Sequence, residues 1–348
     1  MENLAAFVLE NRRMEIQPTA MPVCHENDVL IEIGFCGICG SDLHFYSLGE
    51  PDFPDVYPFV PGHELAGEIV EVGSQVKTLK AGDRVSIEPQ IACGKCEWCK
   101  GGRYNLCPYV KFLSYPRTHG GLRKYVSHPA DMCYKLPNHI STVEGALIEP
   151  LAVGLNATIN TGIVIGKTAA ILGVGCIGLI TLLSLKAMGV EEIAVVDIYD
   201  NRLEKAKALG ATYTINGSQT DIVGALKHLF GGWGPDFVYE TAGNKQTASQ
   251  TVSIAKRGGT VVIIGNVVGQ TPVNFQLAVD KELTFKTTFR YRNVFPVAIN
   301  AIASGRINVK QIISSEYPFK DSMEAFEAAL TQKQSMIKGV IKVADNLA

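Results

Sequence analysis

Short apolar runs separated by glycine and proline turns make up the first 90 residues of the chain. The clearest runs are residues 29–35, 67–72 and 84–88, and their valine and isoleucine content is typical of β-strands. Strand-like alternation of apolar and polar residues returns between residues 119 and 135. We therefore predict a β-rich domain in this part of the chain.

The pattern changes after residue 150, where short apolar runs alternate with helical segments such as 202–209. The runs lie at residues 168–172, 193–196, 212–215, 236–240, 260–264 and 283–287. Strands that alternate with helices in this way predict a parallel sheet covered by helices on both faces. The expected fold class is α/β, with a six-stranded, doubly wound sheet beside the β-rich domain.

The tail of the chain has helical runs at 297–304 and 323–331 and a last apolar strand at 339–343. We expect this tail to rejoin the first domain. The expected domains are therefore 1–151, 152–289 and 290–348.

One further helix is predicted just before residue 150. Ser141 and Glu144 have the S-x-x-E spacing of a capping box, in which each side chain bonds the other residue's backbone N–H. The helix that they begin would carry Ala146, Leu147 and Glu149. Glu149 lies inside an apolar run, and a buried carboxylate needs a partner or a metal, so it is also a candidate site residue.

Three glycines, Gly173, Gly175 and Gly178, form a G-x-G-x-x-G turn directly after the strand at 168–172. This motif is weak by itself, but the order strand, turn, helix, strand is the one that a dinucleotide-binding unit requires. The first glycine allows the tight turn, the second lets the backbone approach a pyrophosphate, and the third lets the helix pack on its strand. Cys176 and Ile177 lie between the last two glycines, at a helix start whose N–H groups can bind an anion.

Asp197 ends the second strand of this unit, about 20 residues beyond the last glycine. A carboxylate at this place can accept hydrogen bonds from both ribose hydroxyls and repels a 2′-phosphate, which favours NAD over NADP. No arginine follows Asp197 directly, and we expect Arg202 to lie near the adenine instead. The alternative is an ordinary strand–helix–strand turn with a surface aspartate.

The 348 residues carry a formal net charge of −2, with lysine and arginine scattered singly. This distribution argues against nucleic acid or a membrane surface as the partner, and a small molecule is expected. No apolar run reaches transmembrane length, and the first residues lack the pattern of a secretory signal. We therefore expect a cytoplasmic protein.

Four of the nine cysteines, Cys93, Cys96, Cys99 and Cys107, lie within fifteen residues. In a reducing compartment such a cluster favours a metal over disulfides, and four thiolates make a closed tetrahedral site for structural zinc. A redox dithiol would need only two cysteines. An iron–sulfur cluster also uses four, but such compact spacing usually has a different sequence around it.

A second set of metal-binding residue types lies in two loops. Cys39, Ser41 and His44 belong to GICGSDLH, and His63 and Glu64 belong to PGHEL. Zinc binds thiolate, imidazole and carboxylate, and a catalytic site keeps one position open, so Cys39, His63 and a carboxylate would suit it. Singly, such a cysteine is more often a small buried residue, and such a histidine a hydrogen-bonded core residue.

Together these motifs resemble the zinc-dependent medium-chain alcohol dehydrogenases, and within them the sorbitol (polyol) dehydrogenase branch. The resemblance spans nearly the whole chain and rests on GICGSDLH, GHELAGEIVEVG, AGDRV, the four-cysteine loop, GALIEPLAVGLNA, GVGCIG with Asp197, ETAG, GGTVVIIG and FRYRNVFPVAI. It implies a GroES-like catalytic domain that is split by a Rossmann NAD-binding domain. It also implies a homodimer or homotetramer.

The resemblance assigns Cys39, His63 and Glu64 as ligands of a catalytic zinc, with Glu149 holding a zinc-bound water or entering the shell. Classical alcohol dehydrogenases have a second cysteine near Glu149, and this chain has none there. Ser41 and His44 match a proton relay. The alternative is that Ser41 caps a helix starting at Asp42 and that His44 lies on its exposed face.

The resemblance also implies coenzyme and substrate contacts in the second half of the chain. Val267, Phe289 and Arg290 match coenzyme-binding positions, and Arg290 and Tyr291 match residues that line the polyol and nicotinamide pocket. Phe45 is a candidate substrate contact as well, and it stands where the animal polyol enzymes often have tyrosine.

The expected function is NAD-dependent, zinc-dependent oxidation of a secondary hydroxyl of a polyol such as sorbitol or xylitol to a ketose. One alternative keeps the chemistry and changes the substrate to a sugar-alcohol phosphate, butanediol or threonine. A more remote alternative is a non-catalytic binding or structural protein on the same fold.

Overall fold

The computed structural model describes residues 2–48, 56–115 and 118–347, and it divides into two units. Unit 1 consists of Met1–Glu149 and Phe295–Ala348, and unit 2 is Pro150–Val294. The chain therefore leaves unit 1 once and returns to it once. These boundaries lie a few residues from the expected ones at 151 and 289.

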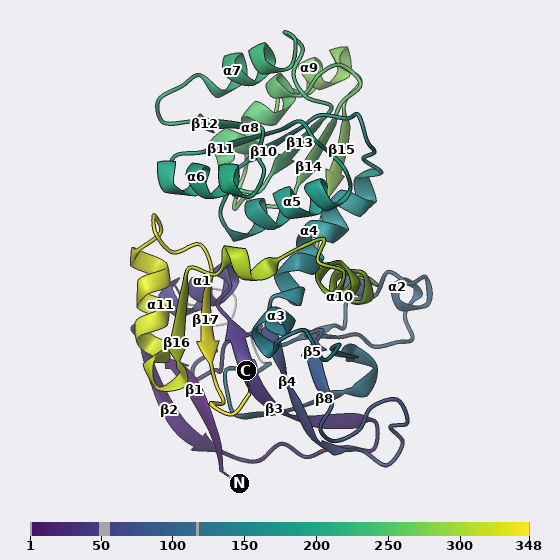
Figure 1. Ribbon diagram of the computed structural model, residues 1–348, viewed down its shortest axis with the longest axis vertical. Helices are drawn as coiled ribbons and strands as arrows, with labels where there is room; N and C mark the ends of the chain where they lie inside the picture. Colours follow the sequence, from purple (N-terminus) through teal and green to yellow (C-terminus); the bar gives the residue numbers. More distant parts are fainter. Residues whose placement is uncertain (1, 49–55, 116–117, 348) are drawn as a thin grey trace. The chain divides into compact units, whose positions relative to one another are not determined.

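A seven-stranded sheet forms the centre of unit 1, in the order β16-β17-β3-β4-β5-β9, with β8 also paired to β3. Its strands are β3 (Asp28–Gly37), β4 (Glu64–Val72), β5 (Arg84–Ile87), β8 (Tyr125–Pro129), β9 (Cys133–Lys135), β16 (Ser315–Pro318) and β17 (Gly339–Lys342). Figure 1 shows β17, in yellow, beside the purple β3. Strands from the two ends of the chain thus share one sheet. The sequence pattern missed β16, a short and partly exposed edge strand.

The remaining elements of unit 1 surround this sheet and hold the loops that carry the candidate ligands. They are β1 (Asn3–Leu9), β2 (Arg13–Thr19), α1 (Gly40–Leu48), β6 (Gln90–Ile91), α2 (Glu97–Lys100), η1 (Tyr104–Leu106), β7 (Lys111–Phe112), η2 (Ala130–Met132), α3 (Thr142–Ala146), α10 (Phe295–Ala303), η3 (Val309–Ile312), η4 (Phe319–Asp321) and α11 (Ser322–Thr331). The buried core joins residues of β1, β3, β4 and β5 to aromatic residues of α1 and α11, such as Tyr46 and Phe326.

The predicted capping box is present: Ser141 accepts a hydrogen bond from the N–H of Glu144, and Glu144 accepts one from the N–H of Ser141. The single helix predicted after it is wrong, however. Helix α3 ends at Ala146, and a second helix, α4 (Ile148–Thr161), begins after Leu147. Pro150 stands in the first turn of α4, where a missing backbone N–H costs nothing.

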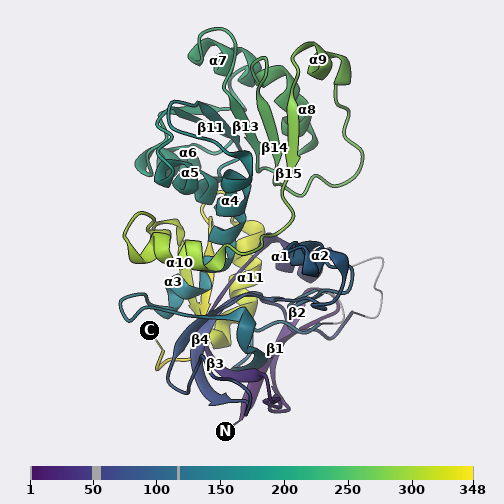
Figure 2. The ribbon, with the colours of Figure 1, turned by 90° about the vertical axis from the view of Figure 1, so that its right-hand side faces the viewer.

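Unit 2 contains a six-stranded parallel sheet in the order β12-β11-β10-β13-β14-β15, which confirms the predicted doubly wound architecture. Its strands are β10 (Ala169–Leu172), β11 (Ile193–Asp197), β12 (Tyr213–Asn216), β13 (Phe237–Glu240), β14 (Thr260–Ile263) and β15 (Thr284–Thr287). Its other helices are α5 (Cys176–Ala187), α6 (Asp200–Ala208), α7 (Ile222–Leu229), α8 (Lys245–Ile254) and α9 (Phe275–Asp280). Strand order reverses at β10, so right-handed crossovers place α5 and α6 on one face and α8 and α9 on the other (Figure 2).

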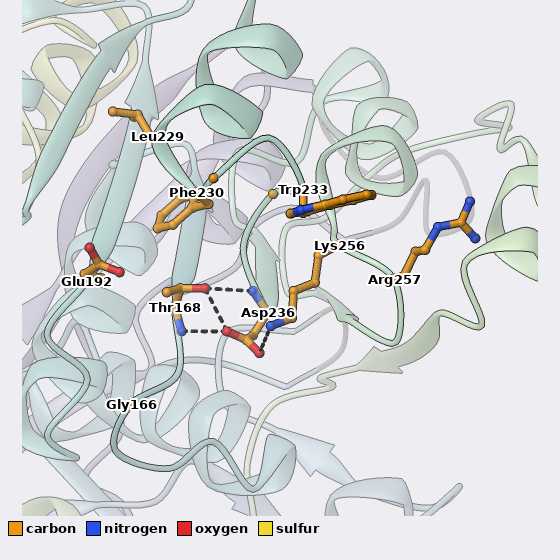
Figure 3. Close-up of a pocket in the computed structure, with 11 residues that line it drawn as sticks. Gly166, Thr168, Glu192, Leu229, Phe230, Trp233, Asp236, Lys256 and Arg257 are labelled. Atoms are coloured by element: carbon orange, nitrogen blue, oxygen red, sulfur yellow. Dashed lines mark hydrogen bonds and ion pairs between the residues drawn. The ribbon is translucent and has the colours of Figure 1, made fainter.

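Asp236 fastens the amino ends of β10 and β13 together, as Figure 3 shows. Its carboxylate accepts hydrogen bonds from the backbone N–H of Thr168 at 3.0 Å and from its hydroxyl at 2.8 Å, and Lys256 Nζ lies 2.5 Å away. Burial raises the pKa of Asp236, but the bonds from Lys256 and Thr168 outweigh burial and lower it to about 2. A charged aspartate with several hydrogen-bond partners therefore links the amino ends of these two strands.

Candidate metal centres and coenzyme site

The loop around α2 brings the four clustered cysteines together. Cys96 Sγ lies 3.4 Å from Cys99 Sγ, Cys93 Sγ lies 4.0 Å from Cys99 Sγ, and the N–H of Cys93 donates to Cys107 Sγ. Four sulfurs about 2.3 Å from one tetrahedral zinc would stand roughly 3.8 Å apart, which these separations bracket. The spacing of the thiols therefore fits a closed zinc site.

Two of these thiols have pKa values that are shifted in opposite directions. Backbone N–H groups of Lys95 and Cys96 point at Cys93 and lower the pKa of its thiol to about 6. Burial and the neighbouring Cys96 thiol raise the pKa of Cys99 to about 12. The Cys93 thiol therefore ionises more readily than its neighbour Cys99.

The second candidate centre lies where β3, β4 and α1 meet. Cys39 directly precedes α1, while His63 and Glu64 stand at the start of β4. One donor atom from each of Cys39, His63 and Glu64 lies within 4.8 Å of the other two. His63 and Glu64 are buried and Cys39 is half-buried. A thiolate, an imidazole and a carboxylate thus converge as a three-ligand zinc site requires.

Glu64 fits against β3 only because residue 37 is a glycine. Gly37 lies opposite Glu64 in the β3–β4 pairing, and a Cβ added at Gly37 would stand 1.9 Å from Glu64 Oε2. Every other amino acid at this position would push the carboxylate away. The glycine therefore makes the space that the ligand side chain occupies.

Asp42, in the first turn of α1, lies against the Nδ1 side of the His63 ring. Its Oδ1 lies 3.3 Å from His63 Nδ1 and accepts hydrogen bonds from the Gly62 N–H and the Ser114 hydroxyl. Nε2 of His63 is then left for a metal, and a carboxylate on the far nitrogen is the usual way to fix a ligand histidine.

The electrostatics of this pair favour positive charge at the site. Burial raises the pKa of Asp42, but the charge of His63 and the hydrogen bonds from His63, Ser114 and Gly62 lower it overall. Burial lowers the pKa of His63, but the negative charges of Asp42 and Cys39 raise it well above its usual range. A proton or a metal ion is therefore attracted to the same place.

The structure places the other candidates of unit 1 on α1 and α4. Helix α1 begins at Gly40, two residues before the expected Asp42, so Ser41 lies inside the first turn and does not cap the helix. The Ser41 hydroxyl donates to Cys39 Sγ at 3.4 Å. His44 is exposed and Phe45 is buried. Glu149 is buried in the first turn of α4 and is not a member of the Cys39, His63 and Glu64 group.

The glycine turn of unit 2 has the shape of a dinucleotide site. Gly173 has φ +93°, and a Cβ there would stand 2.7 Å from the backbone of Ala242. A Cβ at Gly178 would stand 1.9 Å from the carbonyl oxygen of Gly173, so only glycine lets α5 pack against the turn. Helix α5 begins at Cys176, and the half-buried Cys176 and Ile177 form its first turn.

Asp197 is the last residue of β11, and its carboxylate is oriented by three backbone N–H groups. Oδ2 accepts from Val174 at 2.8 Å, and Oδ1 accepts from Ile198 and Tyr199 at 2.8 and 3.1 Å. Arg202 Nη1 lies 3.9 Å from Oδ2, and its guanidinium stands over the Tyr199 ring. The carboxylate therefore sits at the carboxyl end of the sheet, beside the glycine turn.

The remaining coenzyme and substrate candidates follow β14 and β15. Val267 is half-buried, Phe289 is exposed, and the Arg290 guanidinium stands 4.7 Å from the Phe289 ring centroid. Arg290 has φ 55°, and its carbonyl accepts from the Asn156 side chain. Tyr291 is fully buried, so its side chain is positioned to support the neighbouring residues rather than to meet solvent.

A pocket of about 590 Å³ lies in unit 2, at the amino ends of the sheet strands and not at their carboxyl ends. It is lined by Trp233, Phe230, Glu192, Lys256 and Arg257 around Asp236 (Figure 3). These residues are at the amino ends of the strands, whereas ligands of doubly wound sheets bind at the carboxyl ends. This pocket is therefore distinct from the candidate coenzyme site around the glycine turn and Asp197.

Sequence reasoning missed two residues that contact the three-donor group of Cys39, His63 and Glu64. They are Asp42 and Lys338. Asp42 could have been found, since it lies three residues from Cys39 in a motif already assigned to chemistry. Lys338 Nζ lies 2.7 Å from Glu64 Oε1 and 2.8 Å from Oε2, although 274 residues separate the two. Nothing in the local sequence around Lys338 indicates this contact.

The chain matches two family profiles: the alcohol dehydrogenase GroES-like domain over residues 25–138 and the zinc-binding dehydrogenase over residues 176–304. It is 43% identical to an uncharacterised zinc-type alcohol dehydrogenase-like protein of Escherichia coli, over 99% of this chain and 100% of that protein. It is 38% identical to sorbitol dehydrogenase of Bacillus subtilis, over 98% of this chain and 97% of that enzyme.

Solved structures agree with these similarities. A crystal structure of an Escherichia coli oxidoreductase of unknown specificity, involved in membrane biogenesis, superposes with a TM-score of 0.95 at 43% identity. The match covers 99% of this chain and 100% of that one. Among the helices of the described residues, none has the length and hydrophobicity needed to span a membrane.

Proposed function

The chain belongs to the family of zinc-binding alcohol dehydrogenases with a GroES-like domain, and on that premise we propose that it oxidises a secondary hydroxyl of a polyol to a ketose with NAD. The observation that carries the proposal is the convergence of Cys39, His63 and Glu64 within 4.8 Å. A carboxylate in this set makes the site more polar than two thiolates would, which suits a substrate with several hydroxyls.

A zinc ion bound there would supply Lewis acidity, which lowers the pKa of a bound hydroxyl, and NAD would accept the hydride. The chain's own part is to hold and orient these groups. Asp42 fixes the ring of His63, Gly37 makes room for Glu64, and the Ser41 hydroxyl donates to the Cys39 thiolate. Glu149, buried near the start of α4, is proposed to hold water near the metal.

The proton released from the substrate hydroxyl must reach solvent. Ser41 and His44 are exposed and stand three residues apart on α1, so their side chains share one side of the helix. We assign them the proton relay. Phe45, Arg290 and Tyr291 are assigned to shaping the substrate site, with Tyr291 acting through its neighbours because it is buried.

NAD binding is assigned to the glycine turn, Asp197, Arg202, Val267, Phe289 and Arg290. Three N–H groups bond the carboxylate of Asp197 and orient it, and a carboxylate at this place favours ribose hydroxyls over a 2′-phosphate. The four-cysteine loop is assigned a structural zinc, which would hold a loop that has little apolar core of its own.

An NAD reduction screen over sorbitol, xylitol, ribitol, galactitol, their phosphates, butanediol and threonine tests the proposal, with metal analysis on the same sample. We expect two zinc ions per chain and the highest kcat/KM with an unphosphorylated polyol. Glu64→Ala should reduce metal content and polyol turnover together. Full turnover by a metal-loaded Glu64→Ala protein would overturn the role of Glu64.

The alternatives differ in the charge that the substrate site must offer. A sugar-alcohol phosphate would need clustered lysine or arginine at the substrate site, and Arg290 with Arg292 is the pair that we assign there from the sequence. If the screen shows the highest kcat/KM with a sugar-alcohol phosphate, butanediol or threonine, that compound replaces the polyol as the proposed substrate. A protein that binds NAD but reduces it with none of these alcohols would favour a non-catalytic role.

We also propose a cytoplasmic homo-oligomer. Strand β15 lies at the end of the unit 2 sheet, and Phe275, Val279 and Phe285 are exposed beside it. A sheet edge with apolar side chains is a ready surface for a second copy of the chain. Sedimentation should show a dimer or tetramer that Phe285→Asp dissociates. Trp233→Ala, at another exposed position of unit 2, should leave the oligomer intact. A monomeric native protein would exclude the homo-oligomer.

A further inference from the structure

Lys338 is buried, and its ammonium group has a complete set of acceptors. Lys338 Nζ donates to Glu64 Oε1 at 2.7 Å, to Glu64 Oε2 at 2.8 Å and to the carbonyl of Ile38 at 2.9 Å. The side chains of Lys338 and Glu64 are only 3% and 1% exposed. A buried charge is tolerated only where it is paired and hydrogen-bonded, and Lys338 and Glu64 meet that condition for each other.

Three neighbouring strands bring these groups together. Glu64 begins β4, Ile38 follows β3, and Lys338 precedes β17, which lies on the other side of β3. The N–H of Ile38 also donates to the Gly339 carbonyl at 3.0 Å, which fixes the two strand ends beside each other. The position of the ammonium is therefore set by the sheet itself rather than by a flexible loop.

Glu64 consequently faces two partners. Its carboxylate belongs to the three-donor group with Cys39 and His63, and both of its oxygens also bond Lys338. A carboxylate has about four lone-pair sites, and an ammonium that occupies some of them withdraws electron density from the rest. A cation on the far side also repels a divalent ion nearby.

We propose that Lys338 and the catalytic metal compete for the carboxylate of Glu64, so that Lys338 sets how fast the metal leaves the site. Lys338 is thus a positioning residue that acts through Glu64, and the inference rests on the proposed role of Glu64 as a ligand. It follows that the same lysine stabilises the metal-free protein, because it neutralises a carboxylate that burial would otherwise leave unpaired.

Transfer of zinc from the loaded protein to a coloured chelator measures this competition without any substrate. Lys338→Met removes the charge at similar length, and we expect zinc to leave about 10-fold more slowly than from the native protein. Lys338→Arg keeps the charge and should release zinc at a nearly native rate. The four-cysteine zinc is the internal control, since its release should be the same in every variant.

A double-mutant cycle separates the two claims. Glu64→Gln should release zinc about 10-fold faster, and in that background Lys338→Met should change nothing. An unchanged release rate in Glu64→Gln would mean that Glu64 is not a ligand, which overturns the proposed site. Faster or unaltered release in Lys338→Met, with Glu64→Gln behaving as expected, would overturn the competition alone.

Thermal unfolding supplies a second readout. The metal-free Lys338→Met protein should unfold at a lower temperature than the metal-free native protein, and added zinc should raise its unfolding temperature by more. An equal rise in both would contradict the competition. If Lys338→Met does not fold, Lys338→Gln, which keeps hydrogen-bond donors without the charge, carries the same test and the same two outcomes.

Discussion

Oδ1 of Asp42 lies 3.3 Å from Nδ1 of His63, and both side chains are buried. Because the aspartate orients the imidazole, Asp42→Asn should weaken metal binding at the three-donor site about 10- to 100-fold. Competition with a chelator measures the change. Asp345→Asn, at an exposed position of unit 1, is the control and should bind zinc as the native protein does. Native affinity in Asp42→Asn would show that His63 needs no such support.

Gly37→Ala tests the space that Glu64 occupies. The added Cβ would stand 1.9 Å from Glu64 Oε2, so the carboxylate must leave the position that it holds in the three-donor group. We expect metal affinity at this site to fall at least about 10-fold, as it does when a ligand is misplaced. Gly40→Ala is the matched control, since an added Cβ there meets nothing within 4 Å. Equal zinc content and equal release rates in the two variants would contradict this account.

The sequence predicted the elements of unit 2 better than the surroundings of the three-donor group. Each strand of the six-stranded sheet follows from a local apolar run, and the handedness of the crossovers then assigns the connecting helices to the two faces of the sheet. Cys39, His63 and Glu64 could be selected because few residue types bind zinc. Lys338 could not be selected in this way. Its partner Glu64 lies 274 residues away in the sequence, and only the pairing of β17 with β3 brings the two together. β16 was missed because a polar edge strand has no distinctive pattern.

Asp197→Asn tests coenzyme selection. Hydrogen bonds to a charged group contribute about 1.5–3 kcal/mol each, so the KM for NAD should rise about 10- to 100-fold. The KM for NADP should rise less, because the substitution removes the repulsion between Asp197 and the 2′-phosphate while Arg202 stays nearby. Steady-state kinetics with both coenzymes measure this. Asp200→Asn, in the first turn of α6, is the control. An unchanged ratio of kcat/KM for NAD to that for NADP would remove Asp197 from coenzyme selection.

Asp236 predicts a pH dependence for the stability of unit 2. Its folded-state pKa is about 2, below the value of about 3.9 expected for an unfolded chain, so the charged form stabilises the fold. This stabilisation is complete above about pH 4 and is lost as the pH falls through about 2. After solvent screening, Asp236→Asn should cost about 1 to 2 kcal/mol at neutral pH.

Urea unfolding of the native protein and of Asp236→Asn at several pH values measures this difference. The gap between the two free energies of unfolding should be constant above pH 4 and should close near pH 2. Glu191→Gln, at an exposed position of the same unit, should show no gap at any pH. A gap that stays constant down to pH 2 would mean that the side chain stabilises unit 2 without its charge.

The division of unit 1 into two separated stretches of chain has a consequence for synthesis. Unit 2 is continuous, so a ribosome has delivered all of it once Val294 has emerged. Unit 1 still lacks β16, Lys338 and β17 at that moment, although Cys39, His63 and Glu64 left the ribosome long before. All of unit 2 is therefore available to fold before unit 1 is complete, and the carboxylate of Glu64 gains its counter-charge, Lys338, only when translation is nearly finished.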